Sequence, residues 1–338
     1  MTENNGMVWR DRFEGPLRLW GLGTQEGKAF PLCRLPGNVR GVLSEDVRKL
    51  SYHTTGVRLR FRTDADSIAL RARLREEDVL GHGMPRLMRH GFDLYVNGRF
   101  VWNLMAPGNG LLLDEKRELA AGWKEITVYF PLYNGVESLE VGFPSGAQLE
   151  EATPLTIAKP LVFYGSSITH GACASRPGNN YVAMLCRAMD ADYLNLGFSG
   201  NAKGEIELAD FIGDLTMSAF VLDYDHNAPD PAHLARTHYP FYKRVREKQP
   251  DLPILMLTKC DALWNPEDAA QRRAIIRETY RRAQAEGDKH VGFIDGAEFF
   301  GTRFPDNCSA DSIHPNDLGF SRMAERIEPA LRSLLAGQ

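Results

Sequence analysis

The chain has 338 residues, of which 43% are hydrophobic, and a formal net charge of -4 at pH 7. This length predicts two domains, each large enough to bury a core of its own. Residues 1–150 hold 20 basic and 19 acidic side chains, and the rest of the chain holds 20 and 25. Neither half has the basic excess that is typical of proteins that bind nucleic acids. We therefore expect no nucleic-acid partner.

The start of the chain and its cysteines both bear on location. The first residues are polar, and no apolar run approaches the roughly 18 residues that a membrane helix needs. We therefore expect no secretory signal and no membrane partner. Five cysteines, at positions 33, 173, 186, 260 and 308, show no Cys-x-x-Cys spacing. Such a set indicates reduced thiols in a cytoplasmic protein; the oligomeric state stays open.

The first 150 residues alternate apolar and polar side chains, which is the pattern of strands with one wet face. Candidate strands lie at 57–62, 68–74, 92–96, 100–102, 126–130 and 139–143. Asn97-Gly98 between two of them is a strong hairpin signal. We predict an all-β sandwich or jelly-roll domain over residues 1–150. Its arginine-rich faces could bind an anion, although such alternation more often marks a solvated face.

From about residue 155 the pattern changes to short apolar runs, each followed by a helical stretch. The runs lie at 161–165, 193–197, 219–223, 253–258 and 291–295. Helices are expected near 181–189, 204–212, 266–284 and 317–335, with another ending near 248. Buried strands that alternate with helices predict an α/β domain over residues 155–338 with a five-stranded parallel sheet. The domain boundary falls within 144–160.

Function in an open parallel sheet gathers beyond the carboxyl ends of the strands. Polar blocks follow three of the predicted strands, and a fourth precedes the last helix. They are Gly165-Ser166-Ser167-Ile168, Gly197-Phe198-Ser199-Gly200-Asn201, Asp225-His226-Asn227 and Asp311-Ser312-Ile313-His314. We therefore expect their side chains to meet at one edge of the sheet.

This set matches what acyl transfer requires. A serine nucleophile needs a base, and the base needs an acceptor that fixes its tautomer. Asp311 and His314 are three residues apart, so the carboxylate can hold one ring nitrogen while the other faces a serine. The Ser167 and Gly200 N–H groups and the Asn227 amide are the available donors for an oxyanion.

The four blocks, in this order, resemble those of the GDSL/SGNH hydrolases. The resemblance covers roughly residues 155–338 and implies a flavodoxin-like strand order. It also implies Ser167 as the nucleophile, Gly200 and Asn227 as oxyanion donors, and Asp311 with His314 as the rest of a triad. We expect no cofactor and no metal.

The blocks depart from the family pattern at two places. Ser166 stands where the family usually has Asp, and His226 and Ala228 flank Asn227 where Gly-x-Asn-Asp is usual. The motif Gly91-Phe92-Asp93-Leu94-Tyr95 resembles the N-terminal β-sandwich attached to one branch of this family. Members of that branch look like esterases of acylated sugars or acyltransferases that act on small metabolites.

Other roles for these residues stay open. Ser167 could simply cap the following helix. Asp311 and His314 could mark a surface helix start with Pro315 in its first turn.

Several polar residues outside the triad have alternative roles. Asp223, Asp225 and His226 could bind a divalent metal for phosphoester hydrolysis. His226 is otherwise expected either to support the catalytic residues without touching the substrate or to face the substrate. His170 could contact substrate or pack at a helix start, and Trp264 in the loop after the fourth strand is expected to line the pocket.

These residues predict a serine esterase that forms an acyl-enzyme on Ser167. We expect a short-chain ester, chiefly an acetyl ester, of a small molecule or carbohydrate. The alternative is an acyltransferase that uses the same triad and an alcohol acceptor. A metal-dependent phosphoesterase and a non-catalytic carbohydrate-binding protein are less favoured.

Overall fold

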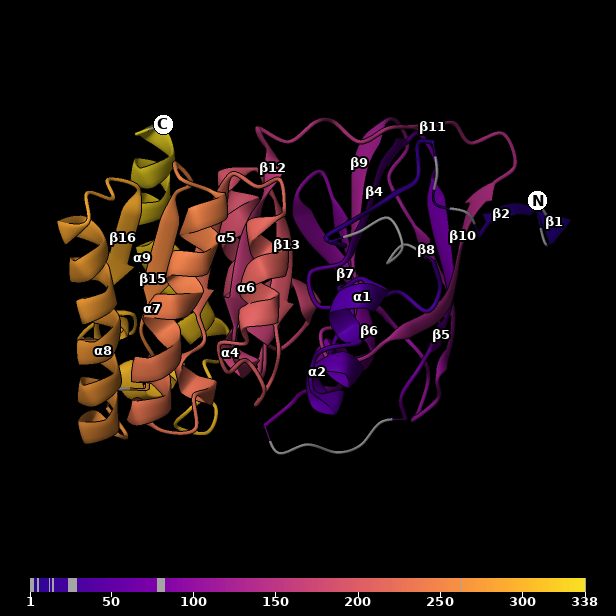
Figure 1. The fold of residues 1–338 in the computed structure, drawn as a ribbon. Helices are drawn as coiled ribbons and strands as arrows, with labels where there is room; N and C mark the ends of the chain where they lie inside the picture. The colour runs from indigo at the N-terminus through magenta and orange to yellow at the C-terminus, as the bar shows by residue number, and fades with distance from the viewer. Residues whose placement is uncertain are drawn as a thin grey trace. The chain divides into compact units, whose positions relative to one another are not determined.

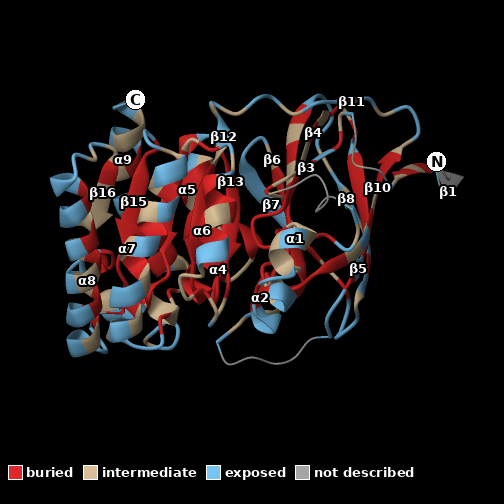
Figure 2. Cartoon of the chain, viewed as in Figure 1, coloured by how far each residue is buried: buried red, intermediate tan, exposed pale blue. Residues whose placement is uncertain are grey.

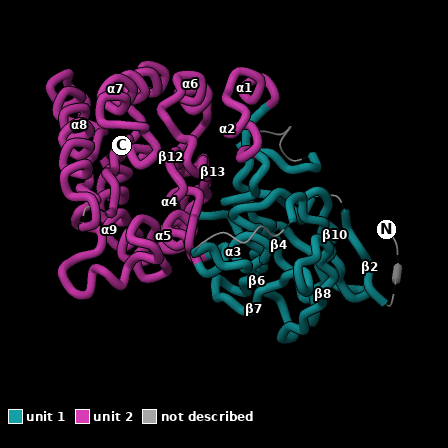
Figure 3. Tube along the Cα trace, turned by 90° about the horizontal axis from the view of Figure 1, so that it is seen from below, with its two compact units in different colours: residues 1–36, 52–155, 175–178 teal, residues 37–51, 156–174, 179–338 magenta. Residues whose placement is uncertain are grey.

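The computed structural model describes residues 3–4, 6–11, 13, 15–23, 29–77, 83–261 and 263–337. The chain forms two compact units, which Figure 3 colours separately. Unit 1 comprises residues 1–36, 52–155 and 175–178, and unit 2 comprises residues 37–51, 156–174 and 179–338. Residues 37–51 therefore belong to unit 2, although the residues on both sides of them belong to unit 1. Residues 175–178 belong to unit 1, although the residues on both sides of them belong to unit 2.

Unit 1 consists of two antiparallel sheets. One has the order β1 (Glu3–Asn4), β2 (Met7–Arg10), β10 (Val136–Pro144), β5 (Ser67–Leu74) and β8 (Leu112–Glu118). The other has the order β11 (Leu149–Glu150), β4 (Arg58–Thr63), β9 (Lys124–Tyr129), β6 (Gly91–Val96) and β7 (Arg99–Met105), and β3 (Arg18–Trp20) also pairs with β4. A short helix, α3 (Arg86–His90), precedes β6. The expected antiparallel sheets in the N-terminal region are confirmed, although three short helices also lie within residues 1–150.

Apolar residues from both sheets form one core, as the alternating sequence pattern predicts. Phe61 of β4 and Phe143 of β10 meet edge to face, with ring centroids 5.5 Å apart, and both are buried. Figure 2 shows buried residues in red along strands of unit 1 such as β4 and β10. The predicted hairpin is present, since Asn97 and Gly98 have φ of 51° and 74° and join β6 to β7. These values suit a type I′ turn, which matches the twist of the paired strands.

The arginines of β4 are engaged within their own sheet region. Arg58 donates a hydrogen bond to the Gly56 carbonyl, and the Arg60 guanidinium lies 5.2 Å from the centre of the Trp20 ring. Arg62 forms an ion pair of 2.7 Å with Glu150. These contacts favour a sheet face stabilised by its own neighbours over a dedicated anion site.

Unit 2 contains a five-stranded parallel sheet. The order is β13 (Ala191–Gly197), β12 (Ile157–Gly165), β14 (Ala219–Asp223), β15 (Ile254–Leu257) and β16 (Val291–Ile294). Numbered along the chain, this is the order 2-1-3-4-5 of the flavodoxin-like fold, which confirms the predicted α/β architecture. The strands are mostly apolar because helices cover both faces of the sheet.

Helices pack on the two faces of this sheet. On one face, α5 (Tyr181–Met189) contacts α9 (Asp317–Ala336). On the other, α6 (Ile206–Gly213) contacts α7 (Pro231–Lys248), which contacts α8 (Pro266–Ala285) (Figure 1). The short helices α1 (Gly37–Arg40), α2 (Glu45–Leu50) and α4 (Ser167–His170) complete the unit. No helix in the described part of the chain is both long and apolar enough to cross a bilayer.

Candidate active site

The loop after β12 carries two adjacent serines with different partners. Ser166 is the N-cap of α4, and its hydroxyl accepts a hydrogen bond of 3.2 Å from the Ile168 N–H. Ser167 is the first helical residue, and its Oγ lies 2.9 Å from Nε2 of His314. The capping role therefore belongs to Ser166, so the Ser167 hydroxyl is not needed for it.

Asp311 and His314 are joined by a tight turn before α9. Oδ1 of Asp311 accepts hydrogen bonds from the N–H groups of Ile313 (3.0 Å) and His314 (2.7 Å). Oδ2 lies 2.7 Å from Nδ1 of the His314 ring. Partial burial would raise the pKa of Asp311, but these hydrogen bonds from His314 and Ile313 outweigh it and lower the pKa. Asp311 is thus an ionised acceptor that fixes both the backbone and the ring of His314.

Two of the predicted oxyanion donors have no other partner among the described residues. Gly200 has a φ of 71°, which favours glycine, and a Cβ added there would meet no atom within 4 Å. Its N–H makes no hydrogen bond to a described residue. The Asn227 side chain likewise makes no hydrogen bond within the described chain, and its Oδ1 is buried. Both groups are therefore available to a ligand.

His170 contacts the block of residues 197–201. The side chain is fully buried, and its Nδ1 accepts a hydrogen bond of 3.4 Å from the Ser199 N–H. A Cβ added at Gly197 would approach the His170 backbone nitrogen to 2.3 Å. These contacts favour the packing role that the sequence left open beside substrate contact.

A buried ionic network holds the turn that carries Asn227, η3 (Asp225–Asn227). The Arg272 guanidinium on α8 donates to the backbone carbonyls of Asp225 and Ala228. Arg272 also bonds Asp268 at 2.8 Å, and Lys259 Nζ lies 2.7 Å from the same carboxylate. The Lys259 N–H in turn donates to Oδ2 of Asp225 at 2.9 Å. Each end of the turn is thus tied to α8.

His226 projects from the same turn into a buried polar environment. Its side chain is 8% exposed, and Nε2 lies 3.6 Å from Oδ1 of Asp261 without forming a hydrogen bond. Burial, together with the charges of Lys259 and His314, lowers the pKa of His226 well below its usual value. The ring is therefore neutral at physiological pH and can both donate and accept a hydrogen bond.

Asp223 at the end of β14 supports the Ser167 helix. Its Oδ2 accepts hydrogen bonds of 2.8 Å from the hydroxyls of Thr169 and Tyr181. Burial raises the pKa of Asp223 to about 6, while these two hydrogen bonds oppose the rise. This structural role was missed by sequence reasoning, which considered Asp223 only as a metal ligand.

Trp264 follows β15 and is 38% exposed. It meets Phe300 edge to face, with ring centroids 6.4 Å apart. Phe300 in turn lines a cavity of about 290 Å³ together with Cys260 and Leu263. Ala262, in the same loop, lies outside the described residues. Trp264 as a contact for substrate stays a prediction.

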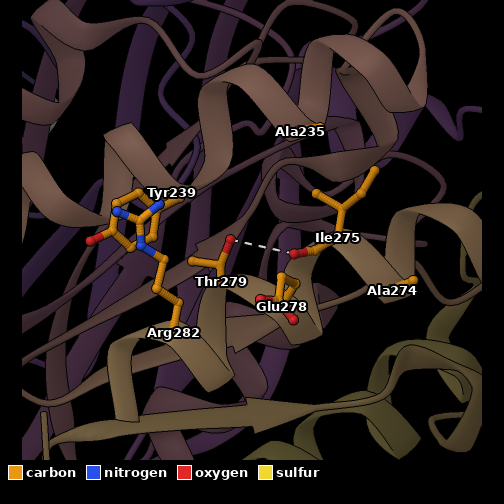
Figure 4. Close-up of a pocket in the computed structure, with 7 residues that line it drawn as sticks. All are labelled: Ala235, Tyr239, Ala274, Ile275, Glu278, Thr279 and Arg282. Carbon is orange, nitrogen blue, oxygen red and sulfur yellow. Dashed lines mark hydrogen bonds between the residues drawn. The ribbon is translucent and has the colours of Figure 1, made fainter. Parts of the chain in front are cut away.

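A second cavity, of about 410 Å³, lies between α7 and α8 and contains none of the predicted site residues. Figure 4 shows its lining: Ala235, Tyr239, Ala274, Ile275, Glu278, Thr279 and Arg282. The Arg282 guanidinium stacks on the Tyr239 ring at 3.5 Å, and Thr279 donates a hydrogen bond to the Ile275 carbonyl. This groove therefore offers no set of groups suited to acyl transfer.

Two protein families match the chain. The GDSL-like lipase/acylhydrolase family matches residues 158–332. The N-terminal region of SGNH-hydrolase-type esterases, which is named for the GxDLY motif, matches residues 7–149. The resemblance seen in the sequence blocks and in residues 91–95 is therefore confirmed. No curated protein matches the chain.

Solved structures agree with these matches. A structure described as that of a GDSL-like lipase from Bacteroides ovatus is 30% identical, with a TM-score of 0.86 and 98% of each chain covered. The salicylyl-acyltransferase SsfX3 from a tetracycline biosynthetic pathway is 21% identical, with a TM-score of 0.80 and 98% of each chain covered. A family two carbohydrate esterase from Clostridium thermocellum is 16% identical, with a TM-score of 0.63, covering 84% of this chain and 94% of that one. At 21% and 16% identity, the last two similarities show a shared fold only.

Proposed function

Because the chain belongs to the GDSL-like lipase/acylhydrolase family and is an ester-hydrolysing enzyme, we propose that it is a serine esterase for short-chain esters, chiefly acetyl esters, of a carbohydrate. The observation that carries this proposal is the chain of contacts from Ser167 through His314 to Asp311. The two steps measure 2.9 Å and 2.7 Å. They have the geometry that a hydroxyl nucleophile, a general base and an orienting carboxylate require.

In the first half of the reaction, Ser167 Oγ attacks the ester carbonyl while Nε2 of His314 takes its proton. The tetrahedral intermediate collapses, His314 protonates the departing alcohol oxygen, and an acyl-enzyme remains on Ser167. Water then loses a proton to His314 and attacks the acyl carbon, and His314 returns that proton to Ser167 as the acid leaves. Asp311 stays ionised throughout and stabilises the imidazolium.

The N–H of Gly200 and the amide of Asn227 would stabilise the oxyanion, together with the N–H of Ser167. The first two groups are free of other partners in the described chain. One such donor typically contributes about 3 kcal/mol to transition-state stabilisation.

Buried polar atoms near the proposed site support a sugar, which carries several hydroxyl groups, as the alcohol part of the ester. Four buried atoms on the loops after β14 and β15 have no hydrogen-bond partner among the described residues: Oδ1 of Asp225, Nε2 of His226, Oδ1 of Asn227 and Oδ1 of Asp261. Buried groups of this kind normally bind water or a ligand. A sugar hydroxyl can donate to the oxygens and accept from His226. The fold similarity to a carbohydrate esterase points the same way.

A series of p-nitrophenyl esters from acetate to octanoate tests the proposal. We expect kcat/KM to be highest for acetate, because no long apolar segment in the sequence could cover a fatty chain. Ser167→Ala should lower kcat by roughly 10⁴-fold or more and abolish labelling by a fluorophosphonate probe. Unlabelled wild-type protein, or full activity in Ser167→Ala, would contradict the proposed nucleophile.

Acyl transfer is the second candidate, because SsfX3 shares the fold over 98% of both chains. The same acyl-enzyme would then react with an alcohol instead of water. Partition of an acetyl donor between acetate and acetylated polyol, measured with and without the acceptor, separates the two activities. Acetate as the sole product at every acceptor concentration would exclude transfer to the acceptors tested.

A further inference from the structure

A buried cysteine lies beside the Asp311–His314 pair. Cys173 follows α4, has a φ of 68°, and is 4% exposed. One ligand atom each from Cys173, Asp311 and His314 all lie within 4.8 Å of one another. The mechanism uses Asp311 and His314 but leaves the thiol without a role.

We propose that Cys173, Asp311 and His314 form an inhibitory site for a thiophilic divalent cation such as Zn²⁺. A thiolate, an imidazole nitrogen and a carboxylate oxygen are the usual protein ligands of zinc, and three of them leave a fourth position for water. The binding follows from the geometry of the three residues, whereas the inhibition rests on the proposed function.

The geometry needs a modest contraction. Zinc–ligand distances of about 2.0–2.3 Å put the ligand atoms of a tetrahedral site roughly 3.5 Å apart. Because no two of the ligand atoms are more than 4.8 Å apart, the side chains would move inward by at most about 1 Å to bind the cation. Asp311 is 36% exposed and His314 19% exposed at the side chain, so a cation has access from solvent, and the buried thiol would be its innermost ligand.

Binding would remove the catalytic base. A cation on Nε2 of His314 occupies the lone pair that receives the proton of Ser167. A cation on Nδ1 displaces the ring proton to Nε2, which then carries hydrogen and cannot accept another. In both cases one proton, that of the Cys173 thiol, is released to solvent. The thiolate and the Asp311 carboxylate together balance the charge of the cation.

The thiol should be protonated without metal. Burial, and then the charge of Asp311, raise the pKa of Cys173 to about 12.

Inhibition of p-nitrophenyl acetate hydrolysis by ZnCl₂ is the first test. We expect inhibition that EDTA reverses, and at least a tenfold higher half-inhibitory concentration in Cys173→Ser and Cys173→Ala, each with wild-type activity in EDTA. Cys186→Ala, at a buried cysteine of α5, is the matched control and should retain wild-type inhibition. Equal inhibition of the wild type and both Cys173 variants would overturn the proposal.

A binding measurement separates this proposal from the proposed function. Isothermal titration of Ser167→Ala with Zn²⁺ should give one equivalent per chain whether or not the protein is an esterase. The double variants Ser167→Ala/Cys173→Ser and Ser167→Ala/Cys173→Ala should lose that equivalent. Co²⁺ should give a thiolate charge-transfer band that both lack. Retention of the equivalent and of the band by folded double variants would exclude Cys173 as a ligand.

Discussion

The carboxylate of Asp311 accepts hydrogen bonds at both oxygens. Oδ1 accepts from two backbone N–H groups, and Oδ2 accepts from the His314 ring. We expect Asp311→Asn to lower kcat by about 10⁴-fold with a small change in KM, because the amide does not hold the productive tautomer. Steady-state kinetics on p-nitrophenyl acetate measure this. Asp306→Asn, at an exposed carboxylate nearby in the chain, should leave kcat unchanged. An Asp311→Asn variant as active as the control would remove Asp311 from the mechanism.

The proposed triad could be predicted because each member stands at a position that local rules identify. Ser167 follows a buried strand, and Asp311 and His314 share one turn. Their contact across 147 residues was expected because both loops lie at the carboxyl edge of the parallel sheet. The hydrogen bonds of the neighbouring residues His170 and Asp223 could not be predicted. His170 receives its hydrogen bond from Ser199, 29 residues along the chain. Asp223 receives one from Tyr181, 42 residues away. Such pairings depend on tertiary packing, which spacing in the sequence does not encode.

Among the elements, η3 depends on α8 for its position. Arg272 reaches the carbonyls at both ends of this turn, with Asn227 between them. We expect Arg272→Lys to lower kcat at least tenfold with a smaller change in KM, since a single ammonium cannot bridge both carbonyls and Asp268 as the planar guanidinium does. Arg273→Lys, next along α8 and paired with Asp295, is the matched control. Similar kinetics for the two variants would show that the contacts of Arg272 have no role in positioning Asn227.

Asp225 should make stability depend on pH. Burial, and then the charge of Asp223, raise its pKa to about 7. Between pH 4 and pH 7 the folded protein therefore retains a proton that the unfolded chain releases, so this group lowers the free energy of unfolding as pH rises. Urea unfolding should show that Asp225→Asn gains stability relative to wild type across this window, on the order of 3 kcal/mol.

The control for Asp225→Asn is Asp214→Asn, at an exposed carboxylate. The difference between its free energy of unfolding and that of the wild type should stay constant from pH 5 to pH 7. A pH-independent difference for Asp225→Asn as well would show that Asp225 is ionised throughout this range.

The parallel strands of unit 2 were predictable as elements because burial on both faces makes them continuous apolar runs. β8 was not, because its sequence, Leu112 to Glu118, is mostly charged and only Leu113 is fully buried. Among the described strands it lies at the edge of its sheet and pairs only with β5, and its side chains are largely in solvent. Hydrophobic periodicity carries no signal for such a strand.

At the scale of the whole molecule, the chain returns to unit 1 for residues 175–178, shortly after α4. Arg176 in this segment pairs with the fully buried Asp93 at 2.7 Å and with the Tyr95 hydroxyl at 2.7 Å. The Gly178 N–H also donates to Asp93. Asp93 and Tyr95 are the polar members of the motif at residues 91–95, so the motif binds this returning segment.

Removal of the Asp93 charge should destabilise unit 1. Asp93→Asn leaves Arg176 without its counter-ion. Burial raises the pKa of Asp93, so loss of its own buried charge offsets part of this cost. We expect a net loss of about 3 kcal/mol in the free energy of unfolding, at the low end for a broken buried pair, measured in urea. Asp114→Asn breaks an exposed pair with Arg71 and should change stability by less than about 1 kcal/mol. Equal effects of the two variants would show that the motif does not stabilise the segment.

The return of residues 175–178 also has a consequence for synthesis on the ribosome. The strands of unit 1 have all been made once Glu150 is translated, but the cation that neutralises Asp93 is Arg176, which follows the proposed nucleophile. Residues 37–51, in contrast, are translated before the rest of unit 2, against which they pack. A nascent chain that stops before Ser175 therefore holds the strands of the sandwich around a carboxyl group that still lacks its counter-ion.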